Sequence, residues 1–400
     1  MEKRKYDFKT IMLILILFLS NIGIMGTTVY SLVMTELYAN LDEWAINLSM
    51  ALPGVLGLVA CLVAGKVADK IDKKLMFVSG LVLFAITGSV FGGLLLYSDI
   101  GQIVAACFNG GICYGMISVS SIGLITDCFQ NEEQRSQVMG WYNGAMAAVG
   151  AVLALIYGNL AVIKWTYAFN ANWFALVVAV LAVFFVPACP PQKQTASAEN
   201  EEKVKGEKGW AKRLTPILLA FFFVSLSYMT VCTYIDLYVS GNGLGDAAFT
   251  GTLASIGTVC SFIACSAFGF TYKKLKTNIT LPAYALIAIG ILVLYIAPGK
   301  ATALVVCGIM GVAWGTAYTF WFFRSTVVVP ENMVGTVTGL VTTANSLSYF
   351  PMPYLFTFLM ASFNTDNFRN ILPVYAGIMV IVFVVALVYK VANRKVDAEQ

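Results

Sequence analysis

Two carboxylates stand at matching places near the ends of long apolar runs, one in each half of the chain. Glu36 belongs to the tetrapeptide TELY at 35–38, and Asp236 belongs to IDLY at 235–238. An acid in an apolar segment is costly unless it faces a watery cavity or a partner, so it is a functional candidate by default. The chemistry open to such groups is the binding and release of a proton or another cation.

The composition determines what kind of element positions these acids. The chain has 59% hydrophobic and 12% charged residues and a mean hydropathy of +0.80, whereas about a quarter of the residues in a soluble domain are charged. A helix needs roughly 20 apolar residues to cross a membrane. We therefore predict an all-α polytopic membrane protein with twelve spans at about 10–37, 45–64, 75–97, 101–126, 138–160, 170–188, 214–240, 247–270, 278–297, 301–325, 334–361 and 371–390.

The lysines and arginines are distributed unevenly between alternate loops. If both termini are cytoplasmic, 22 of the 25 basic residues fall on the inner side, and Lys164, Lys300 and Arg369 remain outside. Basic residues favour the cytoplasmic side, so this asymmetry supports an even number of spans. The net charge of +4 then indicates contact with the lipid bilayer and not with nucleic acid. The short loops favour a bacterial cytoplasmic membrane.

The residue types that carry most enzyme chemistry are scarce. The chain has no histidine, which removes the commonest zinc ligand and the usual general base, and it has no GxxxxGK phosphate-binding loop. Its nine cysteines lie largely inside apolar runs without a CxxC pair. We interpret them as packing residues and expect no disulfide, metal or cofactor. We therefore predict that the protein is not an enzyme.

An internal repeat divides the chain. A polar segment at 189–213, which we predict to be a cytoplasmic linker, separates two halves of six predicted helices at 1–188 and 214–400. The halves match at an offset of about 200 residues, which pairs Glu36–Tyr38 with Asp236–Tyr238, Gly57 with Gly257, Lys73–Leu75 with Lys273–Leu275, and Tyr114–Gly115 with Trp314–Gly315. Two parallel six-helix repeats predict a site between the halves near the midplane, which is typical of transporters.

The loop after the second predicted helix carries a motif with a named resemblance. Its sequence GKVADKIDKKL, at 65–75, resembles the glycine, acid and basic-pair signature of the major facilitator superfamily. The positions of that signature are occupied by Gly65, Asp69, Lys73 and Lys74, with Asp72 where a second glycine is usual. Together with the twelve-helix layout, the resemblance covers essentially the whole chain and implies a cytoplasmic gate at this loop.

The residue types of the motif suit such a gate. Glycine would let helix two approach a neighbour closely, Asp69 can accept from a helix N-terminus or a basic partner, and the lysine pair can meet Asp127 at the end of helix four. The alternative is a stop-transfer loop of snorkelling lysines. The chain departs from proton-driven exporters of the superfamily, because Ala106 stands where an arginine is usual and helix five lacks a Gly-Pro pair. These departures speak against antiport by the familiar drug-export scheme.

The resemblance further implies that helices one, four, seven and ten surround the substrate. Polar and aromatic residues at helical spacing on these helices, with two more on helix eleven, are the predicted substrate-binding residues: Asn21, Thr28, Tyr114, Ser118, Ser121, Tyr228, Cys232, Trp314, Tyr318, Trp321, Asn345 and Tyr349. Their phenol and indole groups suit an organic, aromatic or cationic solute. The other interpretation is that the aromatic residues pack against neighbours or anchor the helix at the interface.

The resemblance also places Glu36 and Asp236 near the outer ends of helices one and seven, which approach each other when the outer gate closes. Converging acids repel, so closure favours protonation of one of them or uptake of a cation. We hypothesise that Glu36 and Asp236 couple outer-gate closure to proton or cation uptake. The alternative, which stays open, is that both acids lie above the hydrocarbon and face water.

These observations predict a secondary active transporter that moves a small organic solute across the cell membrane by alternating access. We expect coupling to protons or another ion, by symport or antiport, and we expect a monomer. The alternatives are an uncoupled facilitator and a non-transporting receptor or sensor of the same fold, because a fold does not determine a function.

Overall fold

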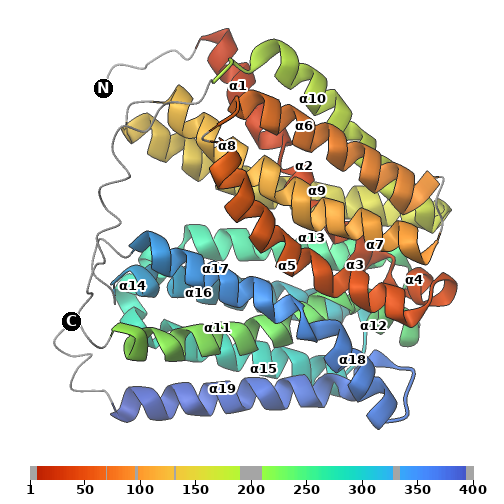
Figure 1. Ribbon diagram of the computed structural model, residues 1–400. Coiled ribbons are helices and arrows are strands. Elements are labelled where there is room, and N and C mark those ends of the chain that lie inside the picture. The colour runs from red at the N-terminus through yellow and green to blue at the C-terminus, as the bar shows by residue number, and fades with distance from the viewer. Residues whose placement is uncertain are drawn as a thin grey trace. The chain divides into compact units, whose positions relative to one another are not determined.

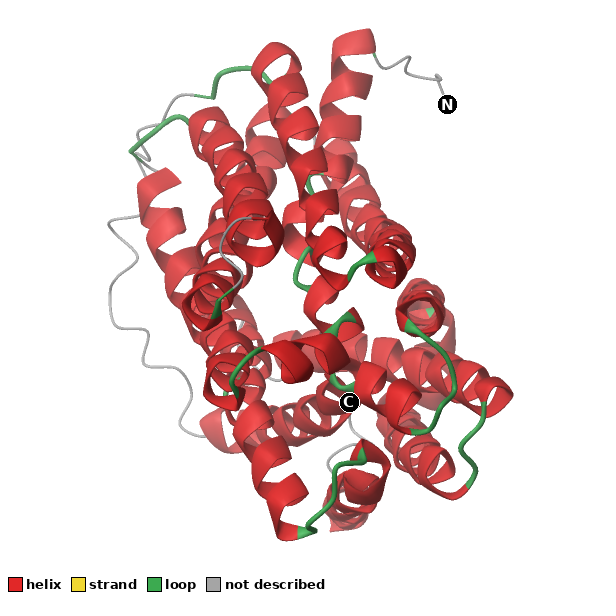
Figure 2. Cartoon of the chain, turned by 90° about the vertical axis from the view of Figure 1, so that its right-hand side faces the viewer, coloured by secondary structure: helices red, strands yellow, loops and turns green. Residues whose placement is uncertain are grey.

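The structure is a computed structural model that describes residues 7–68, 70–94, 98–129, 132–189, 210–327 and 334–392. Within these ranges the chain forms helices joined by loops and turns, and it contains no strand (Figure 2). The chain divides into two compact units, Met1–Glu201 and Glu202–Gln400, each of which is described by itself. The boundary falls inside the predicted linker, of which residues 190–209 lie outside the described part.

Unit 1 is built from ten α-helices, two π-helical segments and one 3₁₀ segment in the described ranges, coloured from red to yellow-green in Figure 1. In chain order they are α1 Phe8–Leu19, α2 Ile22–Met25, α3 Thr28–Leu32, α4 Met34–Asn40, α5 Glu43–Ala68, α6 Lys73–Ile86, η1 Thr87–Leu94, α7 Asp99–Cys107, η2 Phe108–Cys113, α8 Tyr114–Cys128, α9 Glu132–Ile163, η3 Trp165–Trp173 and α10 Phe174–Phe185.

Unit 2 follows the same plan and runs from green to blue in Figure 1. Its described elements are α11 Trp210–Thr233, α12 Ile235–Gly241, α13 Ala247–Ser266, α14 Phe268–Leu275, the 3₁₀ turn η4 Lys276–Ile279, α15 Thr280–Ile296, α16 Lys300–Val327, α17 Val334–Tyr349, α18 Pro351–Ser362, the 3₁₀ turn η6 Phe368–Ile371 and α19 Leu372–Ala392.

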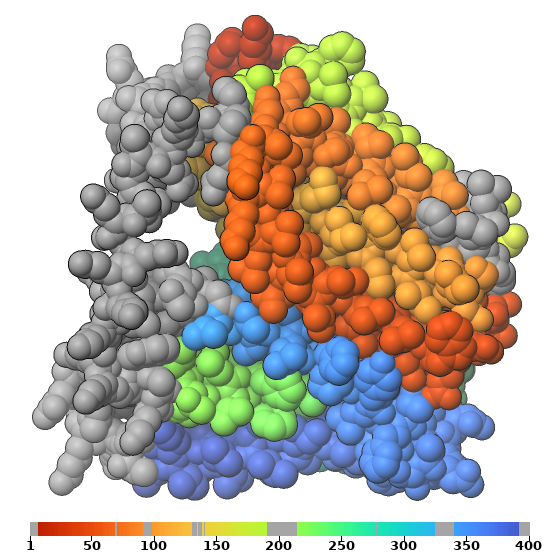
Figure 3. Space-filling view, in the orientation of Figure 1, coloured from red at the N-terminus to blue at the C-terminus, as the bar shows by residue number. Residues whose placement is uncertain are grey.

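The helices have the length and hydropathy of membrane spans. The described residues contain ten helical stretches that can cross a membrane, and an eleventh if α14 and α15, which meet at 111°, count as one span. The pair α17 and α18 covers the remaining predicted span, so the layout agrees with the predicted twelve-helix fold. Large apolar side chains such as Leu62 and Val63 of α5 are exposed, as a lipid environment requires. Figure 3 shows α5, in orange-red, at the surface of unit 1.

The same helix pair packs closely in each unit. A Cβ atom on Gly115 of α8 would lie 2.7 Å from Ala60 of α5, which is closer than real side chains come. Its repeat partner, Gly315 of α16, lies so close to α13 that a Cβ atom would overlap the backbone carbonyl of Ser261. Only glycine fits at either place, because small residues let membrane helices approach each other. The repeat in the sequence is therefore also a repeat in packing.

Both outer acids lie beyond a break in their helix, which corrects the prediction of single continuous helices at 10–37 and 214–240. Val33, between α3 and α4, has φ −122° and ψ 21°, and Tyr234, between α11 and α12, has φ −100° and ψ 16°. These dihedrals lie outside the helical range, so helical spacing does not carry across the break. Glu36 and Asp236 therefore do not share a helical face with the residues that precede the break.

Candidate functional site

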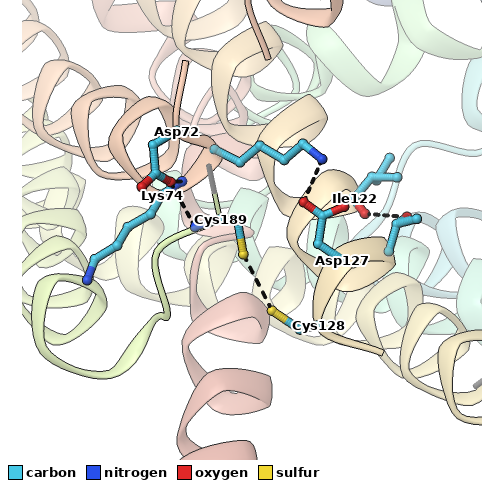
Figure 4. Close-up of polar contacts among 8 residues, drawn as sticks. Asp72, Lys74, Ile122, Asp127, Cys128 and Cys189 are labelled. Atoms are coloured by element: carbon cyan, nitrogen blue, oxygen red, sulfur yellow. Dashed lines mark hydrogen bonds and ion pairs between the residues drawn. The ribbon is translucent and has the colours of Figure 1, made fainter. Parts of the chain in front are cut away.

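The gate motif of unit 1 contains a short ion pair. The Nζ atom of Lys73, at the start of α6, lies 2.6 Å from Oδ2 of Asp127, near the end of α8 (Figure 4). The side chains are 16% and 12% exposed, so the pair is largely shielded from water and weakly screened by salt. The ion pair fastens the cytoplasmic end predicted for helix four to the start of helix three.

Asp72 organises the rest of this end of the unit. It is the N-cap of α6, and its Oδ1 accepts from the backbone N–H of Lys74 at 2.8 Å. The same oxygen accepts from the backbone N–H of Cys189 at 3.1 Å, and the Lys74 ammonium donates to the carbonyl of Val183 at 2.8 Å. A capping acid thus occupies the position where the superfamily signature usually has a second glycine.

The two remaining positions of the motif are less informative. A Cβ atom at Gly65 of α5 would meet no atom within 4 Å, so the expectation that glycine is needed here for a close helix approach is wrong for this conformation. Asp69 lies outside the described residues. The structure therefore brings Lys73 to Asp127, directs Lys74 to the carbonyl of Val183 instead, and assigns no packing role to Gly65.

The polar residues predicted to bind substrate in unit 1 differ in exposure. Asn21 is fully buried at the break between α1 and α2, where its amide donates to the carbonyl of Phe18 at 3.0 Å. Ser121 is also fully buried, whereas Thr28, Tyr114 and Ser118 are half-buried. The half-buried side chains are the ones that a solute can reach without rearrangement of the unit.

The predicted aromatic residues of unit 2 form one cluster. The rings of Tyr228 on α11 and Trp314 on α16 stack with centroids 4.6 Å apart at 7°. Phe221 joins them and stacks on Trp321 at 4.4 Å, and it meets the half-buried Tyr318 edge-on at 5.8 Å. Tyr318 and the Tyr228–Trp314 stack thus form a nearly continuous aromatic wall.

Trp321 belongs to the interior side of that cluster. It is 1% exposed, and its indole N–H donates to the hydroxyl of Tyr284 on α15 at 3.0 Å. On α17, the amide oxygen of Asn345 accepts from Ser225 of α11 at 3.0 Å. Cys232 and Tyr349 are half-buried. A solute contact with Trp321 would require its displacement, whereas Tyr349 and Cys232 are partly accessible.

The two outer acids are enclosed differently. Glu36 is exposed, and its backbone carbonyl accepts from the side chain of Asn40 at 2.7 Å. Asp236 is 4% exposed, and its Oδ1 lies 3.0 Å from the hydroxyl of Thr250 on α13. Exposure of Glu36 fits the simpler interpretation of that acid, whereas enclosure of Asp236 fits a functional carboxylate.

The Thr250 hydroxyl can form a hydrogen bond with Asp236 whether the carboxyl group is ionised or protonated. The Thr250 hydroxyl also lies 3.3 Å from the backbone carbonyl of Asp246. A hydroxyl has one proton to donate and two lone pairs to accept with. Thr250 can therefore donate to an ionised Asp236, or it can donate to the Asp246 carbonyl while a protonated Asp236 donates to it.

Sequence reasoning missed two features of these sites. Thr250 lies 14 residues after Asp236 on the next helix, and no motif marks it. The one available signal is the comparison of the repeats, in which Met50 is the counterpart of Thr250. The thiols of Cys128 and Cys189 are 3.9 Å apart although 61 residues separate them. Among the described residues no cluster of three or more metal-ligating side chains occurs.

Two repeated units of membrane-length helices, one with the Lys73–Asp127 ion pair and one with the enclosed carboxylate of Asp236, define a polytopic membrane protein. The chain belongs to the Major Facilitator Superfamily, because the profile of that family matches residues 11–353.

Named relatives lie within the same family. The chain is 26% identical over 306 residues to the multidrug resistance protein MdtL of Escherichia coli O157:H7 (strain EC4115 / EHEC), which covers 70% of this chain and 72% of that protein. It is 25% identical over 251 residues to multidrug resistance protein 1 of Bacillus subtilis (strain 168), and 24% identical over 245 residues to MdtL of Vibrio parahaemolyticus. These two matches span 59% and 58% of the relatives' own lengths.

Solved structures share the fold at low sequence identity. A bacterial homologue of the human lysosomal transporter Spinster superposes with a TM-score of 0.75 at 14% identity, over 94% of this chain and 95% of that one. A D-xylose-proton symporter gives 0.72 at 16% identity, over 94% and 97% of the two chains. At these identities the likeness concerns the fold, and membership of the superfamily rests on the family match.

Proposed function

We propose that the protein is a secondary active transporter that moves a small organic solute by alternating access and couples that movement to protons through Asp236. The observation that carries the coupling proposal is the enclosed carboxylate of Asp236 beside the Thr250 hydroxyl. A buried acid that keeps a hydrogen-bond partner in both protonation states can gain and lose a proton without leaving a buried polar atom unpaired.

The solute class is inferred from the aromatic cluster of unit 2. Tyr228 and Trp314 are 7% and 8% exposed and stack on each other, so the half-buried Tyr318 beside them is the aromatic ring that a solute meets first. Aromatic faces attract planar and cationic organic groups, and the stack supports the ring of Tyr318 from behind. The described side chains of this cluster supply no basic group that would favour an anion. Relatives that are named multidrug resistance proteins support an organic solute but do not specify its charge or shape.

The gate motif supplies the cytoplasmic closure in this proposal. The Lys73–Asp127 ion pair and the Asp72 cap hold the ends of α6, α8 and α10 together in the present conformation. Changes of conformation during transport would form and break these contacts, so their strength contributes to the free-energy difference between the conformations. The proposal assigns Glu36 a minor role, because water already solvates it.

The proposal is tested by binding and uptake with the purified protein in proteoliposomes. The panel contains planar organic cations, neutral metabolites and monocarboxylates, with and without a pH gradient. We expect uptake of members of the first group, and weaker binding when Tyr228→Leu or Trp314→Leu removes one ring of the stack. Tyr354→Leu, which alters an exposed aromatic ring on α18, is the matched control and should behave as the wild type.

Two outcomes would contradict this proposal. Binding without transport would favour a receptor or sensor, and transport that ignores the pH gradient would favour an uncoupled facilitator. Equal losses of solute binding in Tyr228→Leu and Tyr354→Leu would show that the aromatic stack is not part of the solute site.

A further inference from the structure

Two cysteines meet beside the gate motif. The Sγ atoms of Cys128 and Cys189 lie 3.9 Å apart (Figure 4). Cys128 is the last residue of α8 and directly follows Asp127, the acid of the ion pair. Cys189 lies in the segment that follows α10 and is the last described residue of unit 1. The contact therefore joins the end of α8 to the start of the segment that leads out of the unit.

The backbone of Cys189 is held in place from both sides. Its N–H donates to Oδ1 of Asp72 at 3.1 Å, and its carbonyl accepts from the backbone N–H of Lys73 at 3.2 Å. Both partners belong to the start of α6, whose position is in turn set by the Lys73–Asp127 ion pair. Because the backbone is anchored on both sides, the thiol has few positions available other than beside Cys128.

We propose that Cys128 and Cys189 form a dithiol modification site, which a two-electron oxidant such as hydrogen peroxide converts to a disulfide that locks the end of α8 to the segment after α10. A disulfide requires an S–S distance of about 2.05 Å, so the two sulfur atoms must approach by about 2 Å through side-chain rotation and a small shift of the segment. The reaction needs no change in the order of the helices.

The chemistry balances with peroxide as the oxidant. One thiolate attacks an oxygen of the peroxide, the O–O bond breaks, and a sulfenic acid and one water result. The second thiol attacks the sulfenic sulfur, the S–S bond forms, and a second water leaves. In total the two thiols lose two protons and two electrons, and one peroxide is reduced to two waters.

The surroundings of Cys189 disfavour the thiolate form of its side chain. Burial raises the pKa of the Cys189 thiol, and the carboxylates of Asp127 and Asp72 act in the same direction, whereas the contact with Cys128 and the charge of Lys73 lower it. The thiolate is the reactive form, so a raised pKa slows reaction at neutral pH. The site therefore suits a reducing cytoplasm, where lasting disulfides are rare and transient ones act in redox sensing.

A disulfide at this place would join two parts of the gate covalently and hold a third through hydrogen bonds. It would add a bond between α8 and the segment after α10, while the existing hydrogen bonds join that segment to α6. Transport requires these ends to change their contacts, so oxidation should slow it. That consequence rests on the proposed transport function, whereas the formation and stability of the disulfide do not.

The test uses the full-length protein in proteoliposomes treated with hydrogen peroxide, then alkylated, digested and analysed by mass spectrometry. We expect a peptide pair linked through Cys128 and Cys189, absent from Cys128→Ser and Cys189→Ser and retained in Cys113→Ser, a buried cysteine elsewhere on the chain. The oxidised wild type should unfold about 5 °C or more above the reduced protein, since a cross-link restricts the unfolded chain. Dithiothreitol should reverse both changes.

Each readout can overturn the proposal. No linked peptide in a folded, peroxide-treated protein would reject the dithiol site, and Cys128→Ala provides a second variant if the serine variant unfolds. A linked peptide with unchanged solute exchange would reject the lock. If no solute is transported even in the reduced wild type, the transport proposal fails, while the peptide and the unfolding temperature still decide the dithiol assignment.

Discussion

Glu36 and Asp236 occupy the same position in the two sequence repeats, but their surroundings differ. Asp236 is 4% exposed and lies beside the hydroxyl of Thr250, whereas Glu36 is exposed. At the offset of 200 residues the counterpart of Thr250 is Met50, whose thioether cannot donate a hydrogen bond. The repeat therefore preserves the acid, whereas the hydroxyl that donates to it belongs to unit 2 alone.

The gate ends of the two units differ in the opposite sense. Lys73 pairs with Asp127, whereas the repeat counterparts are Lys273 and Val327, which cannot form an ion pair with each other. Unit 1 thus has the charged latch and an exposed acid, whereas unit 2 has the enclosed acid and no ion pair between the equivalent positions 273 and 327. Duplicated halves can therefore differ in function: unit 1 holds the ion pair proposed for closure, and unit 2 holds the acid proposed for coupling.

The largest effect is expected from Asp236→Asn, which keeps the shape of the side chain and removes its titration. Coupling free energies between sites are typically about 1–3 kcal/mol, so accumulation driven by a pH gradient should fall by roughly 5- to 150-fold. Solute exchange without a gradient should persist. Tracer uptake with and without a gradient measures both quantities.

The matched control for that variant is Asp246→Asn. Asp246 is exposed and caps α13 by accepting from the backbone N–H of Phe249, a role that asparagine can also fill. The control makes the same charge change nearby and should leave accumulation unaltered. Equal losses in the two variants would show that net charge, and not the enclosed carboxylate, is responsible.

The next largest effect is expected from Thr250→Val, which removes the hydroxyl beside Asp236 at nearly constant volume. A buried polar group that loses its partner costs about 1–3 kcal/mol, so the unfolding temperature should fall and gradient-driven accumulation should weaken. Thr250→Ser should restore both. Thr252→Val is the control, because Thr252 donates to the carbonyl of Ala248 on its own helix. A similar loss of stability and accumulation in Thr252→Val would mean that Thr250 has no special role beside Asp236.

An intermediate effect is expected at the ion pair of unit 1. A double-mutant cycle with Lys73→Gln and Asp127→Asn should give a coupling energy of about 1 kcal/mol in the free energy of unfolding, at the upper end for partly exposed pairs. Lys273→Gln in unit 2 should change stability by less than about 0.5 kcal/mol. A coupling energy of zero would mean that the short Lys73–Asp127 contact does not contribute to the stability of the protein.

The smallest effect is expected from Glu36→Gln. Substitution of an exposed side chain typically changes stability by less than about 0.5 kcal/mol, and coupling should remain as in the wild type. Thermal unfolding and gradient-driven uptake measure the two quantities. Loss of accumulation in this variant would reject the contrast between the acids and restore the hypothesis that both of them couple.

The positions of the helices and of the two acids were predictable from the sequence, because apolar runs of membrane length and an offset repeat are properties of the chain itself. The repeat also paired Gly115 with Gly315, and the structure places both at close contacts between matching helices, which were not predicted from the sequence. The contact of Lys73 with Asp127 also followed from charge and helix order.

The depth and the partners of the acids were not predictable. The break at Tyr234 ends the helical periodicity of α11 before Asp236, and no pattern in the sequence marks that break. The partner Thr250 and the contact between Cys128 and Cys189 depend on how separate helices pack, which no local pattern encodes. The expected tight packing at Gly65 failed for the same reason.

The most direct test of the central claim measures proton movement that depends on solute. Wild type, Asp236→Asn and Glu36→Gln are reconstituted with a pH-sensitive dye inside the vesicles, and a transported solute is added without an imposed gradient. The account predicts a change of internal pH in step with solute uptake for the wild type and Glu36→Gln, and uptake without a pH change for Asp236→Asn. Proton movement in Asp236→Asn at the wild-type ratio to solute would contradict the account and assign the coupling to another group.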